Sequence, residues 1–212
     1  MTYSDDGIAQ VWDGGTGLLL FPLHRQEERV AGGAVDADGT RILTWTGNGI
    51  AQLWDSASGE PVSSSFEYDD SFPGPLFSSD GSRILSWAND GTARIRRSKD
   101  GMSATLPIRH AERITGAGFS KDGTRILTSS EDKTARLWDS TTGAEVIPPL
   151  RQDGPVESAQ FGTDDSHILT WGGKQARFWD SASGMAFTAL LEHDEPIWGG
   201  QLNRDGSHIQ RF

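Results

Sequence analysis

A tryptophan followed by aspartate recurs along the chain at a period of 42 residues, or one residue short of it. Val11-Trp12-Asp13 and Leu53-Trp54-Asp55 lie 42 residues apart, and the segments 137–139 and 178–180 continue the series. Ile95-Arg96-Arg97 keeps the position but lacks the Trp-Asp pair. One fixed period indicates an array of structural units that share a core with their neighbours. The 212 residues therefore predict a single domain, residues 1–212.

Each unit contains the signals of four short antiparallel strands. In one unit the strands are expected at residues 114–119, 125–129, 134–139 and 144–150. Asp122-Gly123 separates the first two, and Asp-Gly favours a tight hairpin because glycine accepts positive φ. Pro148 and Pro149 indicate that the fourth strand is an edge strand. No segment shows helical periodicity, so the sequence predicts an all-β protein.

The other units repeat these features in register. The turn reads Asp38-Gly39, Asp80-Gly81, Asp122-Gly123, Asp164-Asp165 and Asp205-Gly206. The strand after it occupies residues 41–45, 83–87, 125–129, 167–171 and 208–212. The turn, the Ile-Leu-Thr/Ser strand and the strand that ends in Leu-Trp-Asp together resemble WD40 repeats, over essentially the whole chain. Their style is similar to repeats strung along large bacterial multidomain proteins. The resemblance implies a β-propeller of four-stranded blades.

The repeat count predicts five blades. Tyr3 and Phe212 lie in the same repeat column as Trp45, Trp87, Ser129 and Trp171. Continuous blades are expected at 29–66, 72–106, 113–150 and 155–191, and a composite blade from 197–212 with 7–23. Such closure covers strand edges that an open array exposes, and it resembles the terminal clasp of WD40 propellers. The two halves can belong to one chain, a five-bladed monomer, or to two chains that share end strands in a ten-bladed dimer.

The resemblance also implies a buried polar network of His, Ser or Thr, Asp and Trp in a blade. One unit carries the complete set: His110, Thr128 or Ser130, Asp132 and Trp138. A buried indole N–H needs an acceptor and a buried carboxylate needs donors, so this blade is expected to be the most rigid. A His near Asp and Ser can also indicate hydrolysis, but recurrence with the repeat favours a structural role. In the other units the His position reads Gln26, Tyr68, Gln152 and His193.

Composition narrows the function classes. The net charge of −11 argues against a nucleic-acid-binding face. The chain has no cysteine, which excludes disulfides and fits a reducing compartment, so a cytoplasmic location is expected. No apolar run approaches the roughly 18 residues of a membrane helix, and none resembles a signal peptide.

No cofactor or metal site is predicted. The five histidines show no ligand spacing. Asp36-Ala37-Asp38-Gly39 starts like a calcium loop, but no Glu follows at the required position, and hairpin chemistry explains Asp38. No phosphate loop, nucleophile elbow or dinucleotide fingerprint occurs.

Two charged surfaces are candidates for binding. The acidic loop residues are Glu27, Glu28, Asp69, Asp70, Glu112, Asp153, Asp194 and Glu195. Repeated round a ring they would form a negative collar that attracts a basic peptide, or they are ordinary solvated loops. The basic patch is Arg94, Arg96, Arg97 and Lys99. It would hold an anionic partner, or its arginines reach solvent or pair with nearby acids.

Three functions fit these observations. The leading hypothesis, implied by the WD40 resemblance, is a non-catalytic protein–protein interaction scaffold that binds a protein or peptide, with no nucleic acid and no membrane as partner. The first alternative is an architectural, engineered or excised repeat unit with no dedicated ligand. The second is a propeller enzyme such as a glycosidase, which needs two carboxylates that face each other.

Overall fold

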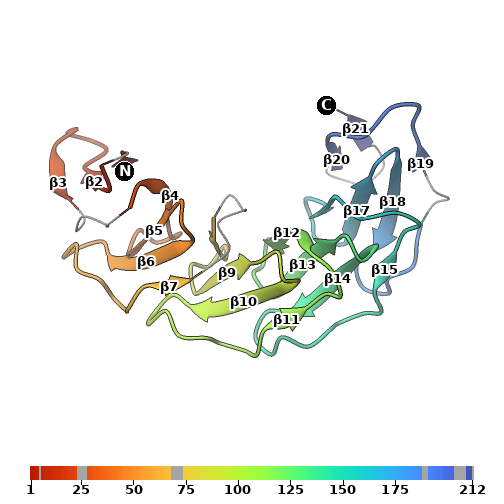
Figure 1. Cartoon of the computed structure of the whole chain (residues 1–212), viewed down its shortest axis with the longest axis horizontal. Coiled ribbons are helices and arrows are strands. Elements are labelled where there is room, and N and C mark those ends of the chain that lie inside the picture. The colour runs from red at the N-terminus through yellow and green to blue at the C-terminus, as the bar shows by residue number, and fades with distance from the viewer. Residues whose placement is uncertain (5, 23–27, 68–73, 188–190, 203–208, 212) are drawn as a thin grey trace. The chain divides into compact units, whose positions relative to one another are not determined.

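The computed structural model describes residues 1–4, 6–22, 28–67, 74–187, 191–202 and 209–211. Within these residues every regular element is a β-strand, and the paired strands run antiparallel. The chain divides into two compact units, residues 1–88 with 94–104 and residues 89–93 with 105–212. Figure 1 follows the strands along the chain from red to blue.

Four sheets in the described part of the chain have four strands, each ordered as they occur in the sequence. The first contains β4 (Val30–Val35), β5 (Arg41–Thr46), β6 (Ile50–Asp55) and β7 (Phe66–Glu67). The second contains β8 (Leu76–Phe77), β9 (Arg83–Trp87), β10 (Thr92–Arg97) and β11 (Ile108–Arg109). The third contains β12 (Ile114–Phe119), β13 (Arg125–Ser130), β14 (Thr134–Asp139) and β15 (Leu150–Arg151). The fourth contains β16 (Ser158–Phe161), β17 (His167–Gly172), β18 (Gln175–Asp180) and β19 (Leu191–Glu192). The all-β, four-stranded prediction is thus confirmed.

Aspartate-centred turns set the register of these strands. Asp122 accepts hydrogen bonds from the Ser120 hydroxyl (2.6 Å) and the Thr124 amide (3.0 Å), and Gly123 takes a φ of 70°. The turn pairs Phe119 with Ile126 across β12 and β13. Because a one-residue slip would turn every core side chain outward, this local chemistry fixes which residues are buried.

The fourth strand of each unit is shorter than the sequence predicts. In place of a continuous strand over 144–150, Glu145 forms an isolated bridge with Trp138, and β15 begins only at Leu150. Pro148 and Pro149 lie between the two pairings. Proline has no amide N–H, so it interrupts the ladder of hydrogen bonds at this edge.

The core lies between the faces of successive sheets. In the second unit, Leu127, Leu137 and Leu150 of the third sheet pack with Ile168 and Trp179 of the fourth, all at most 6% exposed. Area burial of this kind is the main stabilising contribution in a stacked array. In the first unit Leu43, Leu53 and Ile84 form the corresponding cluster.

Among the described residues, no sheet joins the segments 7–23 and 197–212, so the composite blade stays a prediction. β2 (Ala9–Trp12) and β3 (Leu19–Pro22) make a three-stranded sheet with β1 (Thr2–Tyr3). β20 (Gly200–Leu202) and β21 (Ile209–Arg211) pair with each other in a separate sheet. The strand position beside β2 is taken by β1, so closure of the ring is not shown.

Candidate functional site

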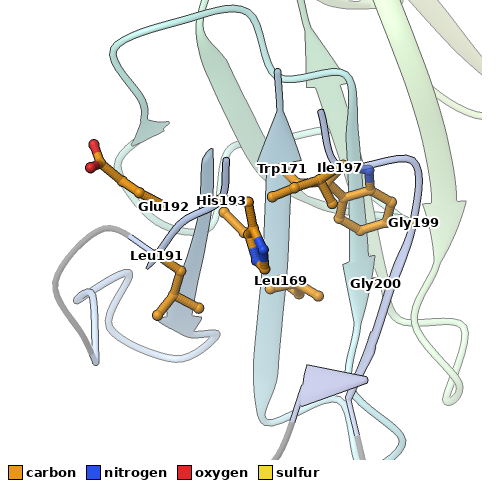
Figure 2. A pocket seen from close by; sticks show the side chains of 9 residues that line it. Leu169, Trp171, Leu191, Glu192, His193, Ile197, Gly199 and Gly200 are labelled. Atoms are coloured by element: carbon orange, nitrogen blue, oxygen red, sulfur yellow. The ribbon is translucent and has the colours of Figure 1, made fainter. Parts of the chain in front are cut away.

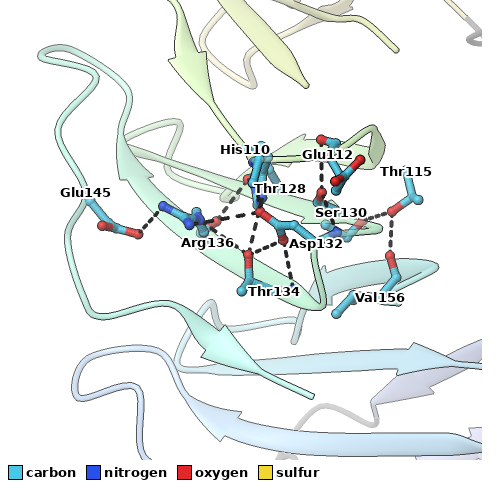
Figure 3. Close-up of polar contacts among 12 residues, drawn as sticks. His110, Glu112, Thr115, Thr128, Ser130, Asp132, Thr134, Arg136, Glu145 and Val156 are labelled. Atoms are coloured by element: carbon cyan, nitrogen blue, oxygen red, sulfur yellow. Dashed lines mark hydrogen bonds and ion pairs between the residues drawn. The ribbon is translucent and has the colours of Figure 1, made fainter. Parts of the chain in front are cut away.

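The most extensive polar network of the described residues lies inside the third sheet (Figure 3). His110 contacts the Asp132 carboxylate through Nδ1 (2.9 Å) and the Thr128 hydroxyl through Nε2 (2.7 Å). The Trp138 indole N–H donates to the same hydroxyl at 2.8 Å. A carboxylate only accepts, so Nδ1 carries the proton of a neutral imidazole, Nε2 accepts from Thr128, and Thr128 accepts from Trp138. Each buried group in this chain of bonds is satisfied.

Burial governs the charge state of this network. Burial lowers the pKa of His110 below its usual value, although the hydrogen bond and the charge of Asp132 act against this. Burial alone would raise the pKa of Asp132, but hydrogen bonds from Thr134, His110 and the Ala111 amide outweigh it, so that pKa is lowered. The stable form is therefore a neutral imidazole bonded to a carboxylate, which holds the sheet together and has no free nucleophile beside it.

Ser130, the other hydroxyl considered for this position, has a different role. Its Oγ donates to the Glu112 carbonyl (3.2 Å) and accepts from the Asp132 amide (3.1 Å). Thr128 therefore occupies the network position, and Ser130 fixes the turn that presents Asp132.

The bond between threonine and tryptophan recurs in other sheets without the histidine. Trp54 donates to Thr44 at 2.8 Å and Trp179 donates to Thr170 at 2.9 Å. In the fourth sheet the side-chain amide of Gln152 donates to the Thr170 hydroxyl at 2.7 Å, so glutamine stands where the third sheet has His110. The repeat placed Gln152 at the position of His110, but it did not predict that the glutamine contacts the threonine as the histidine does.

An acidic hollow of about 740 Å³ opens beside this network. Its lining residues are Ala111, Glu112, Thr115, Glu131, Asp132, Lys133, Pro155 and Glu157. Glu112, Glu131 and Glu157 are exposed, whereas Asp132 is turned inward to His110 and Thr134. Three glutamates against one lysine make this hollow negative, so it attracts cationic groups.

Loop structure positions these glutamates. Glu112 precedes β12, the first strand of the third sheet. Glu131 lies in the β13–β14 turn, where it contacts Arg113 at 3.5 Å. Glu157 precedes β16 and accepts a hydrogen bond from the Gly173 amide at 3.1 Å. Glu112 is one of the predicted acidic loop residues. Glu157 was missed, because the repeat gives no acidic residue in its column.

The other predicted acidic residues do not line this hollow. Glu28, Asp153, Asp194 and Glu195 are exposed on separate loops. Glu27, Asp69 and Asp70 lie outside the described residues, as do Gln26 and Tyr68 of the histidine column. The continuous negative collar therefore stays a prediction.

The basic patch is placed on β10 and the turn after it. The Arg96 guanidinium lies 4.3 Å from the centre of the Phe66 ring and donates to the Gly101 carbonyl. Arg97 pairs with Asp100 at 2.8 Å, while Arg94 and Lys99 are exposed. Arg96 fills the place of the missing tryptophan by stacking, a contact that repeat comparison could not indicate.

A second, largely apolar hollow of about 260 Å³ lies on the fourth sheet (Figure 2). Leu169, Trp171 and Ala176 form one wall, and Ile197, Gly199 and Gly200 approach from the next segment. Leu191, Glu192 and His193 complete it. Within the described ranges, no group of three His, Asp or Glu residues could hold a metal ion, and no helix is long and apolar enough to span a membrane.

Comparison with known proteins gives the fold. Residues 103–139 match the family model of the WD domain, G-beta repeat (WD40). The chain is similar to the C-terminal WD40 domain of Sif2, with a TM-score of 0.71 and 21% identity over 97% of this chain and 58% of that one. It is also similar to the computationally designed Ika8 protein, with a TM-score of 0.69 and 18% identity over 94% of this chain and 60% of that one. No curated protein sequence matches. The chain thus spans about three fifths of the length of these solved structures.

Proposed function

We propose that this chain, which carries a WD40 repeat and folds into WD40-type blades, is a non-catalytic binding module that holds a basic segment of another protein. WD40 propeller domains generally mediate protein–protein interaction. The acidic hollow beside the third sheet is the proposed binding site. The observation that carries the proposal is the convergence of Glu112, Glu131 and Glu157 on one hollow of about 740 Å³.

Charge and shape support a lysine- or arginine-containing segment. The hollow lies within the volume range of typical ligand sites, which is roughly 300–1,000 Å³. Asp132 is bonded to His110 and Thr134, so a ligand would contact the exposed glutamates, of which Glu131 also pairs with Arg113 and Glu157 also accepts from the Gly173 amide. Contacts between exposed charges are screened by salt, so binding should weaken as ionic strength rises. The overall charge of −11 adds attraction at longer range.

The test is a binding titration with a short, fluorescently labelled peptide rich in Lys and Arg. The combined variant Glu112→Gln, Glu131→Gln and Glu157→Gln keeps side-chain shape and removes three charges. We expect at least a tenfold loss of affinity at low salt, which corresponds to about 1.4 kcal/mol. The matched control, Glu60→Gln with Glu67→Gln and Glu192→Gln, removes the same charge elsewhere. Equal affinity loss in both variants would show that net charge alone attracts the peptide.

Ring closure is the second part of the proposal. In the described part of the chain, two sheets have fewer than four strands: the sheet of β1, β2 and β3 and the sheet of β20 and β21. Their places at the two ends of the repeat series support a fifth blade made from residues 7–23 and 197–212, in one chain or between two. The molar mass in solution decides between a monomer of 23.0 kDa and a dimer. A polydisperse open assembly would contradict both closed rings.

A further inference from the structure

We propose that Trp198 extends the acidic hollow into a longer binding surface for a segment with two basic side chains. The glutamates of the hollow hold one of these side chains, and the other stacks on the Trp198 ring. This inference rests on the basic-peptide site proposed above and states which peptides that site prefers. All its residues belong to the second compact unit, residues 89–93 with 105–212. The site then selects peptides by the spacing of their charges and not by net charge alone.

Trp198 is an exposed aromatic side chain on a fixed backbone. It is 86% exposed, whereas Trp138, Trp171 and Trp179 of the same unit are at most 7% exposed. Ile197, the residue before it, is buried and belongs to the apolar cluster of the fourth sheet. The chain is therefore anchored at this point while the indole lies in solvent. Tryptophan is enriched among the residues that contribute most to binding, so an exposed tryptophan of this kind is a candidate ligand contact.

Two hydrogen bonds place Trp198 next to the acidic hollow. The Gly173 amide donates to the Glu157 carboxylate at 3.1 Å, and the Gly173 carbonyl accepts from the Ile197 amide at 2.7 Å. One residue thus connects Glu157, which lines the hollow, to the segment that carries Trp198. The path is on the order of 10 Å long, a distance that about three residues of an extended peptide span. One short peptide can therefore reach both the glutamates and the indole.

The Gly172–Gly173 turn of the fourth sheet makes this arrangement possible. A Cβ atom at Gly172 would collide with the Pro155 carbonyl oxygen, so glycine is needed for the segment that carries Glu157 to approach this closely. The turn contains no carboxylate of its own, unlike the equivalent turn of the third sheet, and its Gly173 amide is bonded to Glu157 instead. The turn therefore holds Glu157 on the side of the hollow that faces the Trp198 segment.

The charge around Trp198 favours a cation. Asp194 and Glu195 precede Trp198 on the same segment and are exposed, as Glu157 is. Lys174 donates to the Asp194 carbonyl, so one lysine stands against three carboxylates. A negative surface raises the local concentration of positively charged groups. The surroundings of the indole thus continue the negative charge of the hollow.

Contacts inside the unit show which basic side chain suits an indole ring. The Arg136 guanidinium lies 6.0 Å from the centre of the Trp138 ring, and the Arg177 guanidinium lies 5.4 Å from that of Trp179. A cation over an indole is attracted by the negative face of the ring, and the planar guanidinium of arginine also stacks on it. The exposed Trp198 ring offers the same contact to an arginine of a ligand.

The test titrates two labelled peptides at low salt, one with a single arginine among serines and one with two arginines separated by two serines. Trp198→Ala should weaken binding of the two-arginine peptide roughly fivefold, as for one cation–π contact, and leave binding of the one-arginine peptide unchanged. Trp198→Phe keeps an aromatic ring and should retain part of the difference. Leu106→Ala is the matched control, because Leu106 is also 86% exposed, and it should bind both peptides as the parent does.

The outcomes separate this inference from the proposed function. If Trp198→Ala bound the two-arginine peptide as tightly as Leu106→Ala does, Trp198 would have no part in binding, while the acidic hollow would stand. Equal weakening of both peptides by Trp198→Ala would also overturn the inference, because the indole would then not recognise the second arginine. A parent protein that bound neither peptide would overturn the hollow and the role of Trp198 together.

Discussion

The third and the fourth sheet each contain a hydrogen bond from a tryptophan to a threonine, but different residues support that bond in the two sheets. In both, a buried tryptophan donates to a threonine hydroxyl, from Trp138 to Thr128 and from Trp179 to Thr170. In the third sheet the threonine is also bonded to His110, which is anchored on Asp132. In the fourth, Gln152 makes that contact. The Thr–Trp bond is thus the recurring structural element, and the His–Asp pair is an addition that introduces sensitivity to pH.

Of the changes that test this comparison, removal of the Asp132 carboxylate should lower the free energy of unfolding most. Asp132→Ala leaves the His110 Nδ1–H and the Ala111 and Thr134 amides without their acceptor. We expect a loss of about 3 kcal/mol in the free energy of unfolding, because several buried donors lose their partner together. Denaturant titration measures it, with the exposed Asp153→Ala as control. If Asp132→Ala lowered the free energy of unfolding by less than about 0.5 kcal/mol more than the control does, the carboxylate would not stabilise the sheet.

Substitution of the shared threonines should give two similar effects. Thr128→Val and Thr170→Val each remove the acceptor of a buried indole N–H, and each also strands a second polar partner, His110 or Gln152. A loss of about 2 kcal/mol is expected in each case. Thermal unfolding compares the two variants directly. If only Thr128→Val destabilised the protein, the Thr–Trp bond would not be the common element.

Conversion of one network into the other should have a smaller effect. His110→Gln offers Thr128 an amide donor in place of the Nε2 acceptor, as Gln152 donates to Thr170, but it loses the bond to Asp132 at 2.9 Å. We expect a loss of about 1 kcal/mol. The reverse change, Gln152→His, should bring no gain, because the turn of the fourth sheet has Gly173 and Lys174 and no carboxylate there. A gain in Gln152→His would mean that histidine stabilises the sheet without aspartate.

The smallest expected effect is a shallow dependence of stability on pH. Burial lowers the pKa of His110 in the folded chain, so below about pH 6.5 the unfolded chain binds more protons at this residue. Its neutral form thus stabilises the fold at higher pH, and that contribution falls as pH drops below about 6.5. The turn carboxylates act in a separate window, since the pKa of Asp122, lowered chiefly by Ser120 and then Thr124, is about 2.

The measurement is the difference in unfolding free energy between the parent and His110→Gln across pH 5 to 7.5. The difference should shrink as pH falls. A constant difference would show that His110 binds protons equally in the folded and unfolded chains.

Local chemistry made the strands predictable. The Asp-Gly turns bind their own backbone, as Asp38 does with the Thr40 amide at 3.0 Å, and so they mark strand ends without reference to distant residues. The Thr–Trp network was predictable because its members recur in fixed columns. Pro148 and Pro149 interrupt the fourth strand, whereas only an edge position was predicted from them.

Contacts between different repeats could not be predicted from one repeat. Arg96 stacks on Phe66, and Gln152 bonds to Thr170 in place of a histidine. A comparison of equivalent repeat positions does not show which side chains come into contact. The acidic hollow depends on Glu157, which comes from the sheet after the one that supplies Glu112 and Glu131. Closure remained open because no sheet of the described residues joins the first strands of the chain to the last ones.

Hydrogen exchange of the indole N–H groups, followed by NMR, tests the central comparison most directly. The account predicts the slowest exchange for Trp138, whose acceptor is fixed by His110 and Asp132, then Trp179, and the fastest for Trp12, which is 39% exposed. Substitution of each tryptophan by phenylalanine assigns the signals. Exchange from Trp138 as fast as from Trp12 would contradict the claim that the threonine-centred network holds these sheets together.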